Sequence, residues 1–331
     1  VARLLARAGQ RVLVLEARDR IGGRTWTERS DGHITDRGAS WIHGVDDNPL
    51  AEVVSAFGMR EVEFTVGSYQ PYGRPIAYYG PAGERLSDEA AARFAGDVRE
   101  CDRHLADTIA ASSAGSTYDD AIEATLARLG WGDARAERVR EFLRHRSEEQ
   151  YGVSASGLDA HGLDDDAVDG DEVVFPEGFD VLAARLAAGL DVRLEHEVSR
   201  VSWSADGVRV ASSRGDFSAA RAVVTVPIGV LKSDDFVIDP PLPQRLAQAI
   251  SGLEMNHFEK VFLRFPTRFW DEGVYAIRQQ GEAGKWWHSW YDLTALHGTP
   301  TLLTFAAGPC AEMIRDWSDD QVADSVLSAL R

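Results

Sequence analysis

The run Arg11-Val12-Leu13-Val14-Leu15-Glu16 is short, apolar and ends in an acid, and Ala17-Arg18-Asp19-Arg20-Ile21-Gly22-Gly23-Arg24 follows it directly. An apolar run of this length between polar neighbours is typical of a buried parallel strand. Residues 1–8 before it have an apolar side, and Gly9 suits a helix end. Helix, tight turn, strand and acid make up the second half of a βαβ unit, so the sequence predicts an α/β fold.

The chemistry of this segment fits a dinucleotide. An acid at the end of the second strand of a dinucleotide-binding fold accepts hydrogen bonds from the two ribose hydroxyls of an adenosine, and Glu16 is placed for that role. The backbone at Gly22 and Gly23 can approach a pyrophosphate closely, and Arg24 can neutralise it. Glu16 by itself would indicate only a solvated acid at a strand end. The whole ten-residue string favours a cofactor site.

Composition excludes several classes of protein. Lysine and arginine total 35 and aspartate and glutamate 53, so the 331 residues carry a formal net charge of −18. An acidic chain of this kind is a poor candidate for binding nucleic acid or an anionic membrane, and it attracts cationic ligands. No apolar run approaches the roughly 18 residues of a membrane span. We find no Cys-based or His-x-x-x-His metal pattern, so no metal is expected, and the cytoplasm is the default location.

A helical insert is expected between two strand-rich regions. Residues 87–112 predict the clearest helix, with Ser87 as its cap and Cys101 on its apolar stripe, where we expect a small core residue. Two further helices are expected near residues 122–129 and 139–143. Strands are expected at residues 191–195, 197–203, 208–211, 222–226 and 258–265, with a hairpin turn at Asp206-Gly207. The order predicts two discontinuous domains, with residues 1–50 and 172–245 for a cofactor and residues 51–171 and 246–331 for a substrate.

Five further segments carry a family resemblance. They are Asp36-Arg37-Gly38-Ala39-Ser40-Trp41-Ile42-His43-Gly44 with Asn48-Pro49, Pro176-Glu177-Gly178-Phe179-Asp180 through Leu190, the strand that contains Val198, Val223-Val224-Thr225-Val226-Pro227-Ile228-Gly229-Val230-Leu231-Lys232, and Glu259-Lys260-Val261 through Phe269-Trp270. In this order they resemble the flavin-containing amine oxidase family, which includes polyamine oxidases, monoamine oxidases and lysine-specific histone demethylases. The resemblance implies a FAD-binding Rossmann-like domain of the glutathione-reductase type with a discontinuous α+β substrate domain.

The resemblance also implies which residues contact FAD. The stretch from Gly38 to Trp41 matches the part of the family that lies against the isoalloxazine ring, and Val198 matches a valine whose backbone meets the adenine portion. The expected cofactor-binding residues are Glu16, Arg18, Gly23, Arg24, Gly38, Ala39, Ser40, Trp41 and Val198. The family's Gly-rich phosphate loop should lie just before Val1 and its second cofactor segment beyond Arg331. We therefore expect the chain to be an internal piece of a longer enzyme.

Lys260 and His43 are the expected catalytic residues. Strand alternation places Lys260 between Phe258 and Phe262 on one face, with Val261 on the other, so the lysine is either partly desolvated or an ordinary snorkelling surface residue. The resemblance favours the first interpretation, because Lys260 falls where these oxidases hold a water against the flavin N5. His43 falls where the polyamine-oxidase branch faces the substrate amine, and a structural histidine is the alternative.

Two other features have open interpretations. The acidic loop at residues 164–171 predicts a solvated surface turn, with a cation-attracting rim as the alternative. The aromatic group Trp286, Trp287, Trp290 and Tyr291 predicts either a substrate cage or packing in the core.

The resemblance implies a function. The expected reaction is FAD-dependent oxidation of a cationic small-molecule amine, polyamine-like or a monoamine, to an imine, with dioxygen as the electron acceptor and hydrogen peroxide as a product. A desaturase or protoporphyrinogen oxidase-like enzyme of the same fold, or a non-catalytic flavin-fold fragment, is the alternative. The string Trp41-Ile42-His43-Gly44 and Lys260 favour the amine branch.

Overall fold

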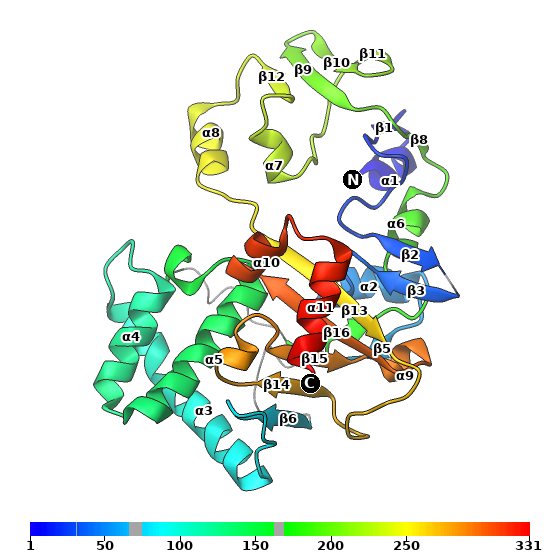
Figure 1. Cartoon of the computed structure of the whole chain (residues 1–331). Helices are drawn as coiled ribbons and strands as arrows, with labels where there is room; N and C mark the ends of the chain where they lie inside the picture. The colour runs from blue at the N-terminus through cyan, green and yellow to red at the C-terminus, as the bar shows by residue number, and fades with distance from the viewer. Residues whose placement is uncertain (31, 66–74, 162–168) are drawn as a thin grey trace. The chain divides into compact units, whose positions relative to one another are not determined.

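The computed structural model describes residues 1–30, 32–65, 75–161 and 169–331, and it divides the chain into two units (Figure 1). The first unit comprises Val1–Trp41, Glu52–Arg60 and Glu177–Met255. The second comprises Ile42–Ala51, Glu61–Pro176 and Asn256–Arg331. Each unit is therefore assembled from three separate pieces of the chain.

These boundaries differ from the predicted domain ranges at residues 42–50, 52–60, 172–176 and 246–255. Ile42 ends strand β4 (Trp41–Ile42), and the three-stranded sheet β4–β7–β5 continues with β7 (Val173–Val174) and β5 (Val62–Glu63). The end of helix α2 (Pro49–Ala56) leads into Phe57, whose ring packs against Arg3, with the guanidinium carbon 5.6 Å from the ring centroid. The Arg185 guanidinium also donates to the Phe57 carbonyl. These contacts tie residues 52–60 to the first unit.

The first unit contains the strand that the sequence predicts after Gly9. Helix α1 (Ala2–Arg7) precedes β1 (Leu13–Leu15), and β1 pairs in parallel with β8 (Asp191–Arg193), which follows helix α6 (Asp180–Ala187). Strands β2 (Thr27–Ser30) and β3 (His33–Asp36) form an antiparallel pair. Two strands, each preceded by a helix, therefore lie side by side with their carboxyl ends at the same edge.

A second sheet of this unit has the order β11–β10–β9–β12. Its strands are β9 (Val198–Ser204), β10 (Gly207–Ser212), β11 (Gly215–Ala219) and β12 (Val237–Asp239), and helices α7 (Ile228–Leu231) and α8 (Gln244–Ser251) flank β12 in the chain. The predicted hairpin is confirmed, with its turn one residue earlier than expected: Ala205 and Asp206 form the turn, and Gly207 begins β10 opposite Ser204. The strand predicted at residues 222–226 is wrong: the segment pairs with no described strand, and Val223 is 61% exposed.

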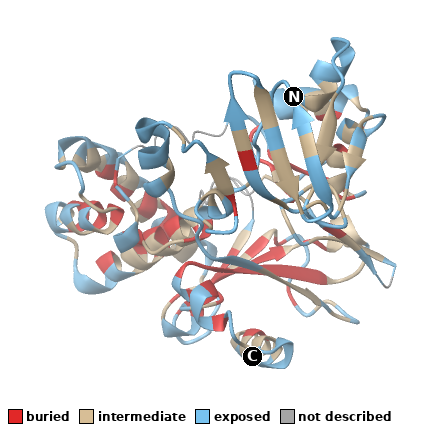
Figure 2. Ribbon diagram, turned by 90° about the horizontal axis from the view of Figure 1, so that it is seen from above, coloured by how far each residue is buried: buried red, intermediate tan, exposed pale blue. Residues whose placement is uncertain are grey.

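The second unit is built on a five-stranded sheet with the order β13–β16–β15–β14–β6. Its strands are β6 (Ile76–Tyr79), β13 (Phe258–Arg264), β14 (Ala276–Gln279), β15 (Ser289–Asp292) and β16 (Thr301–Ala307). Strands β6 and β14 are parallel and the other pairs are antiparallel. Strand β16 is buried along its whole length, as the colouring of the sheet in Figure 2 shows. The short helices α9 (Thr294–His297) and α10 (Pro309–Ile314) flank β16 in the chain, and α11 (Asp319–Ala329) follows.

The aromatic group next to β14 belongs largely to the core of this unit. Trp287 and Trp290 are buried in a cluster with Trp270, Leu302 and other apolar side chains, and Tyr291 is buried beside them in sequence. Core packing is therefore the correct interpretation for these three residues, and Trp286 packs against the same cluster while partly exposed. The predicted substrate cage does not form from side chains this deeply buried.

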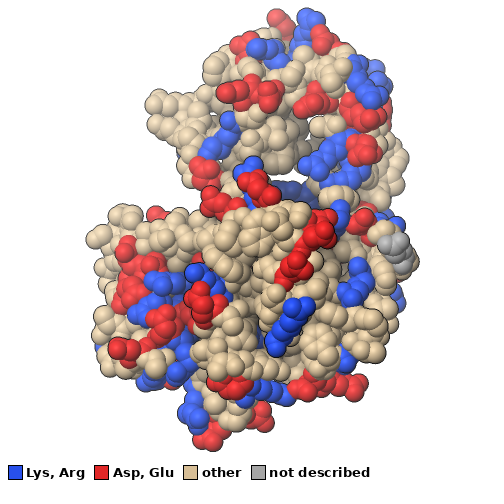
Figure 3. All heavy atoms as spheres, viewed as in Figure 1, with Lys and Arg blue, Asp and Glu red and all other residues tan. Residues whose placement is uncertain are grey.

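The predicted helical insert is confirmed as α3 (Asp88–Ala111), α4 (Tyr118–Leu129) and α5 (Asp133–Tyr151). Ser87 caps α3 by accepting a 3.2 Å hydrogen bond from the Ala90 N–H. Cys101 is fully buried in the core between these helices, and burial raises its pKa to about 12, so it is an unreactive thiol. Arginine and acidic side chains interleave on the outer face of the insert (Figure 3), as in the bidentate pair of Arg144 with Asp119.

No helix in the described part of the chain is both long and apolar enough to cross a membrane.

Candidate functional site

The carboxyl ends of the parallel strands β1 and β8 bring several of the expected cofactor residues together. The His196 N–H donates to the Glu16 carbonyl at 2.9 Å, and the Glu195 N–H donates to the Arg18 carbonyl at 2.8 Å. Val198 follows two residues later at the start of β9. Ligands of open α/β sheets bind outside the carboxyl ends of the strands, which is where this group lies.

The Glu16 carboxylate is oriented by its own turn. Its Oε1 atom accepts a 2.9 Å hydrogen bond from the Arg18 N–H, and the side chain is partly exposed. A carboxylate has about four acceptor sites, so this single bond leaves capacity for neighbouring hydroxyl donors. The predicted role of Glu16 on a ribose is chemically consistent with this geometry.

The Gly22-Gly23-Arg24 turn has an open backbone and an exposed arginine. Gly22 has φ +100° and Gly23 φ +55°, conformations that side chains disfavour, and a Cβ added to Gly23 would meet no atom within 4 Å. Arg20 holds the turn from inside, since its guanidinium donates to the Gly23 carbonyl at 3.0 Å and to the Thr25 carbonyl at 3.3 Å. The predicted cofactor contacts of Gly23 and Arg24 thus fall on an accessible surface.

Gly38 and Ala39 lie directly against this turn. The Ala39 N–H donates to the Arg24 carbonyl and the Gly38 N–H to the Trp26 carbonyl, both at 3.0 Å. A Cβ at Gly38 would collide with the Arg24 carbonyl and would lie 2.7 Å from the Trp26 amide nitrogen. Glycine is therefore required at residue 38 because two backbone segments touch there. The structure brings the predicted residues 23–24 and 38–39 into one local arrangement.

The motif at residues 176–180 is explained by the way it docks onto β2 and β3. The Phe179 N–H donates to Asp36 Oδ1 at 3.0 Å, and Asp180 makes a bidentate pair with Arg29 at 2.7 and 2.8 Å. Burial would raise the pKa of Asp180, but hydrogen bonds from Arg29 and Thr27 outweigh it and lower that pKa. Asp36 and Asp180 thus anchor the start of α6, which leads into β8.

His43 and Lys260 belong to the second unit, whereas the nine expected cofactor residues belong to the first. Ser40, the residue before Trp41, is 7% exposed, and its hydroxyl donates weakly to the Asp36 and Gly38 carbonyls at 3.4 and 3.5 Å. Trp41 begins β4 and is partly exposed. Asn48 secures the chain beyond His43, because its side chain donates to the Gly44 carbonyl at 2.8 Å and accepts from the Leu50 N–H at 2.9 Å.

The sequence interpretation missed the residue that faces His43. Nδ1 of His43 lies 3.3 Å from Oε1 of Glu172, whose side chain is 1% exposed, while that of His43 is 55% exposed. Of the predicted acidic loop at residues 164–171, the structure describes only residues 169–171, because residues 162–168 lie outside the described residues. Asp169 and Asp171 are exposed, as expected for a surface turn. Glu172 departs from that pattern, and the signal was its position directly before the apolar run Val173-Val174-Phe175.

Lys260 lies in the middle of β13 and pairs with Phe305 of β16. The predicted alternation is confirmed on its apolar side, because Val261 and Leu263 pack against the buried aromatic cluster of this unit. The opposite side carries Phe258, which is 41% exposed, and Lys260, which is partly buried. Lys260 is thus neither a fully solvated nor a fully buried lysine, and its catalytic role stays a prediction.

Within the ranges that the structure describes, no group of three His, Cys, Asp or Glu side chains is placed to hold a metal ion.

Comparisons with known proteins give the chain a family. Polyamine oxidase 4 of Oryza sativa subsp. japonica is 30% identical over all of this chain and 69% of its own length. Lysine-specific histone demethylase 2 of Homo sapiens is 29% identical over all of this chain and 42% of its own length. Among solved structures, cyclohexylamine oxidase from Brevibacterium oxydans IH-35A has a TM-score of 0.77 at 22% identity, covering 99% of this chain and 77% of that one.

A variant of putrescine oxidase redesigned in its cofactor binding gives a TM-score of 0.75 at 24% identity, with the same coverage of 99% and 77%. Likeness at this identity establishes the fold, which is that of the flavin-dependent amine oxidases, as the sequence predicts. The model of the flavin containing amine oxidoreductases matches residues 1–331. The chain therefore belongs to the flavin containing amine oxidoreductase family.

Proposed function

We propose that this enzyme uses FAD to oxidise a cationic polyamine-like amine to an imine, with dioxygen as the terminal electron acceptor. A bound FAD would supply the two-electron chemistry at the carbon next to the amine nitrogen and would return its electrons to dioxygen as hydrogen peroxide. The match to polyamine oxidase over the full chain supports the reaction class. The observation that carries the substrate assignment is the pairing of exposed His43 with buried Glu172.

The choice of FAD rests on the first unit. Glu16, at the end of β1, presents a carboxylate suited to ribose hydroxyls, and the open turn at Gly23 and Arg24 suits a pyrophosphate. Both features suit an adenine dinucleotide, which has a ribose and a pyrophosphate, so they favour FAD over a flavin that lacks the adenosine half. Arg18, Ala39, Ser40, Trp41 and Val198 remain predicted contacts of the same cofactor.

The His43–Glu172 pair fits an amine that carries positive charge. A carboxylate can only accept hydrogen bonds, so Glu172 favours a proton on Nδ1 of His43. In a neutral imidazole this leaves Nε2 as an acceptor, which suits an N–H of a substrate. The negative charge of Glu172 and the net charge of −18 of the chain both favour cations over anions.

Spectroscopy of the flavin-loaded protein tests this function. Addition of a diamine or triamine without oxygen should bleach the flavin absorption, and admission of oxygen should restore it with one hydrogen peroxide per amine oxidised. A panel with an aromatic monoamine and a methylated lysine peptide would show where the preference lies. Failure of every amine in the panel to bleach the flavin would refute amine oxidation, and a preference for the monoamine would refute the polyamine assignment.

A further inference from the structure

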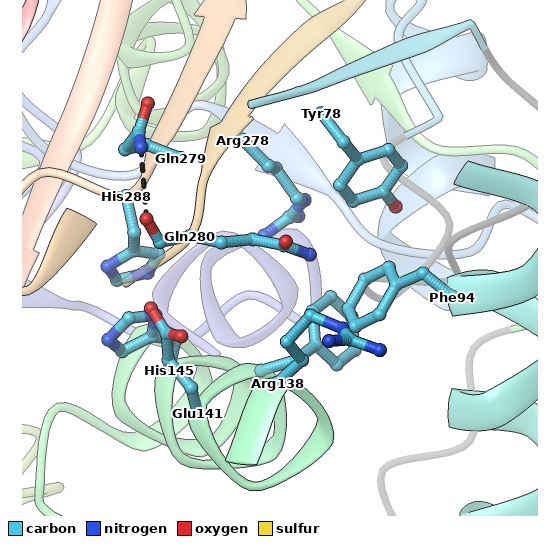
Figure 4. A pocket seen from close by; sticks show the side chains of 10 residues that line it. Tyr78, Phe94, Arg138, Glu141, His145, Arg278, Gln279, Gln280 and His288 are labelled. Carbon is cyan, nitrogen blue, oxygen red and sulfur yellow. Dashed lines mark hydrogen bonds between the residues drawn. The ribbon is translucent and has the colours of Figure 1, made fainter. Parts of the chain in front are cut away.

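A small cavity lies inside the second unit, beside the helical insert. Its volume is about 20 Å³, and its walls come from β6, α3, α5, β14 and the residues that follow β14. The polar side chains that face it include Tyr78, Glu141, His145, Arg278, Gln280 and His288 (Figure 4). One water needs roughly 10–15 Å³ of such space, so the cavity admits an occupant of about that size.

Three of these side chains have polar atoms that are buried and unsatisfied. Tyr78 is 3% exposed, and Gln280 and His288 are each 6% exposed. The Tyr78 hydroxyl, the Gln280 Nε2 and the His288 Nδ1 have no hydrogen-bond partner among the described residues. Buried polar groups are normally paired, because an unmade hydrogen bond leaves their desolvation uncompensated. Such atoms around one small space indicate an occupant that pairs with at least some of them.

Gln279, the last residue of β14 and the neighbour of Gln280, has a side-chain amide whose hydrogen bonds are made within the chain. Gln279 also lines the cavity, but its Nε2 donates to the Gly80 carbonyl at 2.7 Å and to the Gln280 carbonyl at 2.9 Å. Figure 4 shows the Gln280 side chain running the other way, toward the space between Tyr78 and Arg138. The chain thus supplies acceptors for the side-chain amide of Gln279, whereas no described residue supplies one for the Nε2 of Gln280.

The charges around the cavity favour an acceptor that is itself negative. Arg278 is 6% exposed and donates to Ser289 Oγ at 2.8 Å, and Arg138 brings a second guanidinium to the wall. Among the described residues that line this cavity, Glu141 is the one carboxylate, and its Oε1 already accepts a 2.7 Å bond from the Gly281 N–H. Burial raises the pKa of Glu141 to about 6, so its charge is held less firmly than that of an ordinary glutamate.

A second buried carboxylate, that of Glu149, lies outside the wall and is already engaged. Glu149 is 5% exposed, accepts from the Tyr291 hydroxyl at 3.1 Å and pairs with Nε2 of His288. His145 stacks on His288 with 3.8 Å between ring centroids, and burial with the charges of His288 and Arg278 holds the pKa of His145 well below its usual value. The groups that remain turned to the cavity are mainly donors.

From this geometry we infer that the cavity is a binding site for a small inorganic anion of chloride size. The anion accepts from the Gln280 amide and the Tyr78 hydroxyl and lies in the field of Arg278 and Arg138. By joining residues of β6, α5 and the end of β14, it would tie the helical insert to the sheet of the same unit. The site is independent of flavin and of the proposed amine reaction.

Halide titration of thermal unfolding tests the site. The full chain is heated in sodium gluconate that is replaced stepwise by sodium chloride or bromide at constant ionic strength. A ligand that binds only the folded state raises Tm in a saturable way, and we expect a rise of about 2–4 °C. Crystals grown in bromide should show an anomalous peak next to Gln280.

A matched pair of variants makes the result specific. Gln280→Met should abolish the halide-dependent rise in Tm, while Gln279→Met, which breaks satisfied hydrogen bonds, should lower Tm but keep the rise. The same Tm in gluconate and chloride, or a halide response that survives in Gln280→Met, would overturn the proposal. Electron density in the cavity without an anomalous bromide signal would mean that the cavity holds only water. This result would also overturn the proposal. The bromide experiment decides the matter on the unaltered chain should Gln280→Met not fold.

Discussion

The imidazole of His43 is held from its inner side by Glu172, with Nδ1 and Oε1 3.3 Å apart. The two partners differ sharply in environment, because the carboxylate is buried and the ring is more than half exposed. A carboxylate can only accept hydrogen bonds, so Glu172 favours a proton on Nδ1 and orients the ring at that edge. Glu172 is therefore a positioning residue for His43.

This relationship predicts a specific loss in His43→Ala. Hydrogen bonds to charged groups are worth ~1.5–3 kcal/mol, so removal of the imidazole should raise KM for a diamine by roughly tenfold or more. The KM for a monoamine of equal length, which lacks the second nitrogen, should change much less. Steady-state kinetics on both substrates measure the difference.

The Glu172→Gln variant should raise the diamine KM in the same direction but by less, because the amide oxygen can still accept from Nδ1. Asp171→Asn is the matched control: Asp171 is the exposed neighbour of Glu172 and receives a 3.3 Å hydrogen bond from Thr65 instead. Equal KM changes for diamine and monoamine in His43→Ala would make His43 a structural residue only.

A second prediction concerns Glu16 and the retention of flavin. Glu16→Gln keeps the shape of the side chain but removes the charge that would strengthen hydrogen bonds from two ribose hydroxyls. The ratio of flavin to protein after gel filtration should fall, with no change in the far-UV circular dichroism. Glu195→Gln is the control, since Glu195 follows the neighbouring strand β8 as Glu16 follows β1, but pairs with Arg214 at 2.9 Å. Flavin content equal to that of the unaltered protein would contradict the assignment of Glu16.

Features that depend on neighbours in the chain could be predicted from the sequence. The stripe of apolar residues around Cys101 repeats at helical spacing, so α3 and its buried face follow from local geometry. The alternation around Lys260 likewise predicts which side of β13 faces the core. The hairpin between β9 and β10 is equally local, because Asp206 lies in its two-residue turn and Gly207 follows directly.

Features that depend on distant partners could not be predicted. The apolar run at residues 222–226 has the composition of a strand, but a strand exists only where another backbone completes its ladder. Ile76 of β6 pairs with Ala276 of β14, and no local sequence pattern predicts a pairing between residues so far apart in the chain. Glu172 is the clearest case at the site: an acidic run predicts solvent, and only the tertiary fold buries its last member against His43.

Glu148 in α5 makes stability depend on pH in a way that one variant should remove. Burial raises its pKa from 4.5 to about 7, with Arg144 acting in the opposite direction. The folded state therefore keeps a proton that the unfolded chain loses near pH 4.5, and this contribution to stability declines as pH rises from about 4.5 to 7. The shift corresponds to at most ~3 kcal/mol, and partial solvation reduces it to about 1–2 kcal/mol.

Glu148→Gln should consequently raise Tm at pH 8 and leave it nearly unchanged at pH 5, as measured by calorimetry at both values. Glu137→Gln on the same helix is the control, because that carboxylate is 65% exposed and pairs with Arg140 on the surface. A Glu148→Gln variant that loses stability at pH 8 would show that the charged carboxylate is stabilised by its surroundings.

The last prediction concerns Lys260. Lys260 lies in the middle of β13, opposite Phe305, and the residue is partly buried. Lys260→Met preserves the length and apolar stem of the side chain, so packing of β13 should change little, while the charge and any water held by it are removed. Flavin should stay bound, and the flavin half-reactions should slow by ~10²–10⁴-fold, the loss expected for one positioned acid–base group.

Stopped-flow absorbance separates the two half-reactions in Lys260→Met. Anaerobic mixing with an amine reports reduction of the flavin, and mixing of the reduced enzyme with oxygen reports its reoxidation. A slow second step with a normal first step would assign Lys260 to the reaction with oxygen, and the reverse would assign it to the amine. Lys285→Met is the control in the same unit, because that lysine is surface-exposed and pairs with Glu282 at 3.5 Å. Unaltered rates in both steps would leave Lys260 as a strand lysine that extends to solvent. A charge in contact with the reacting groups cannot be removed without changing the rate of reduction or the rate of reoxidation.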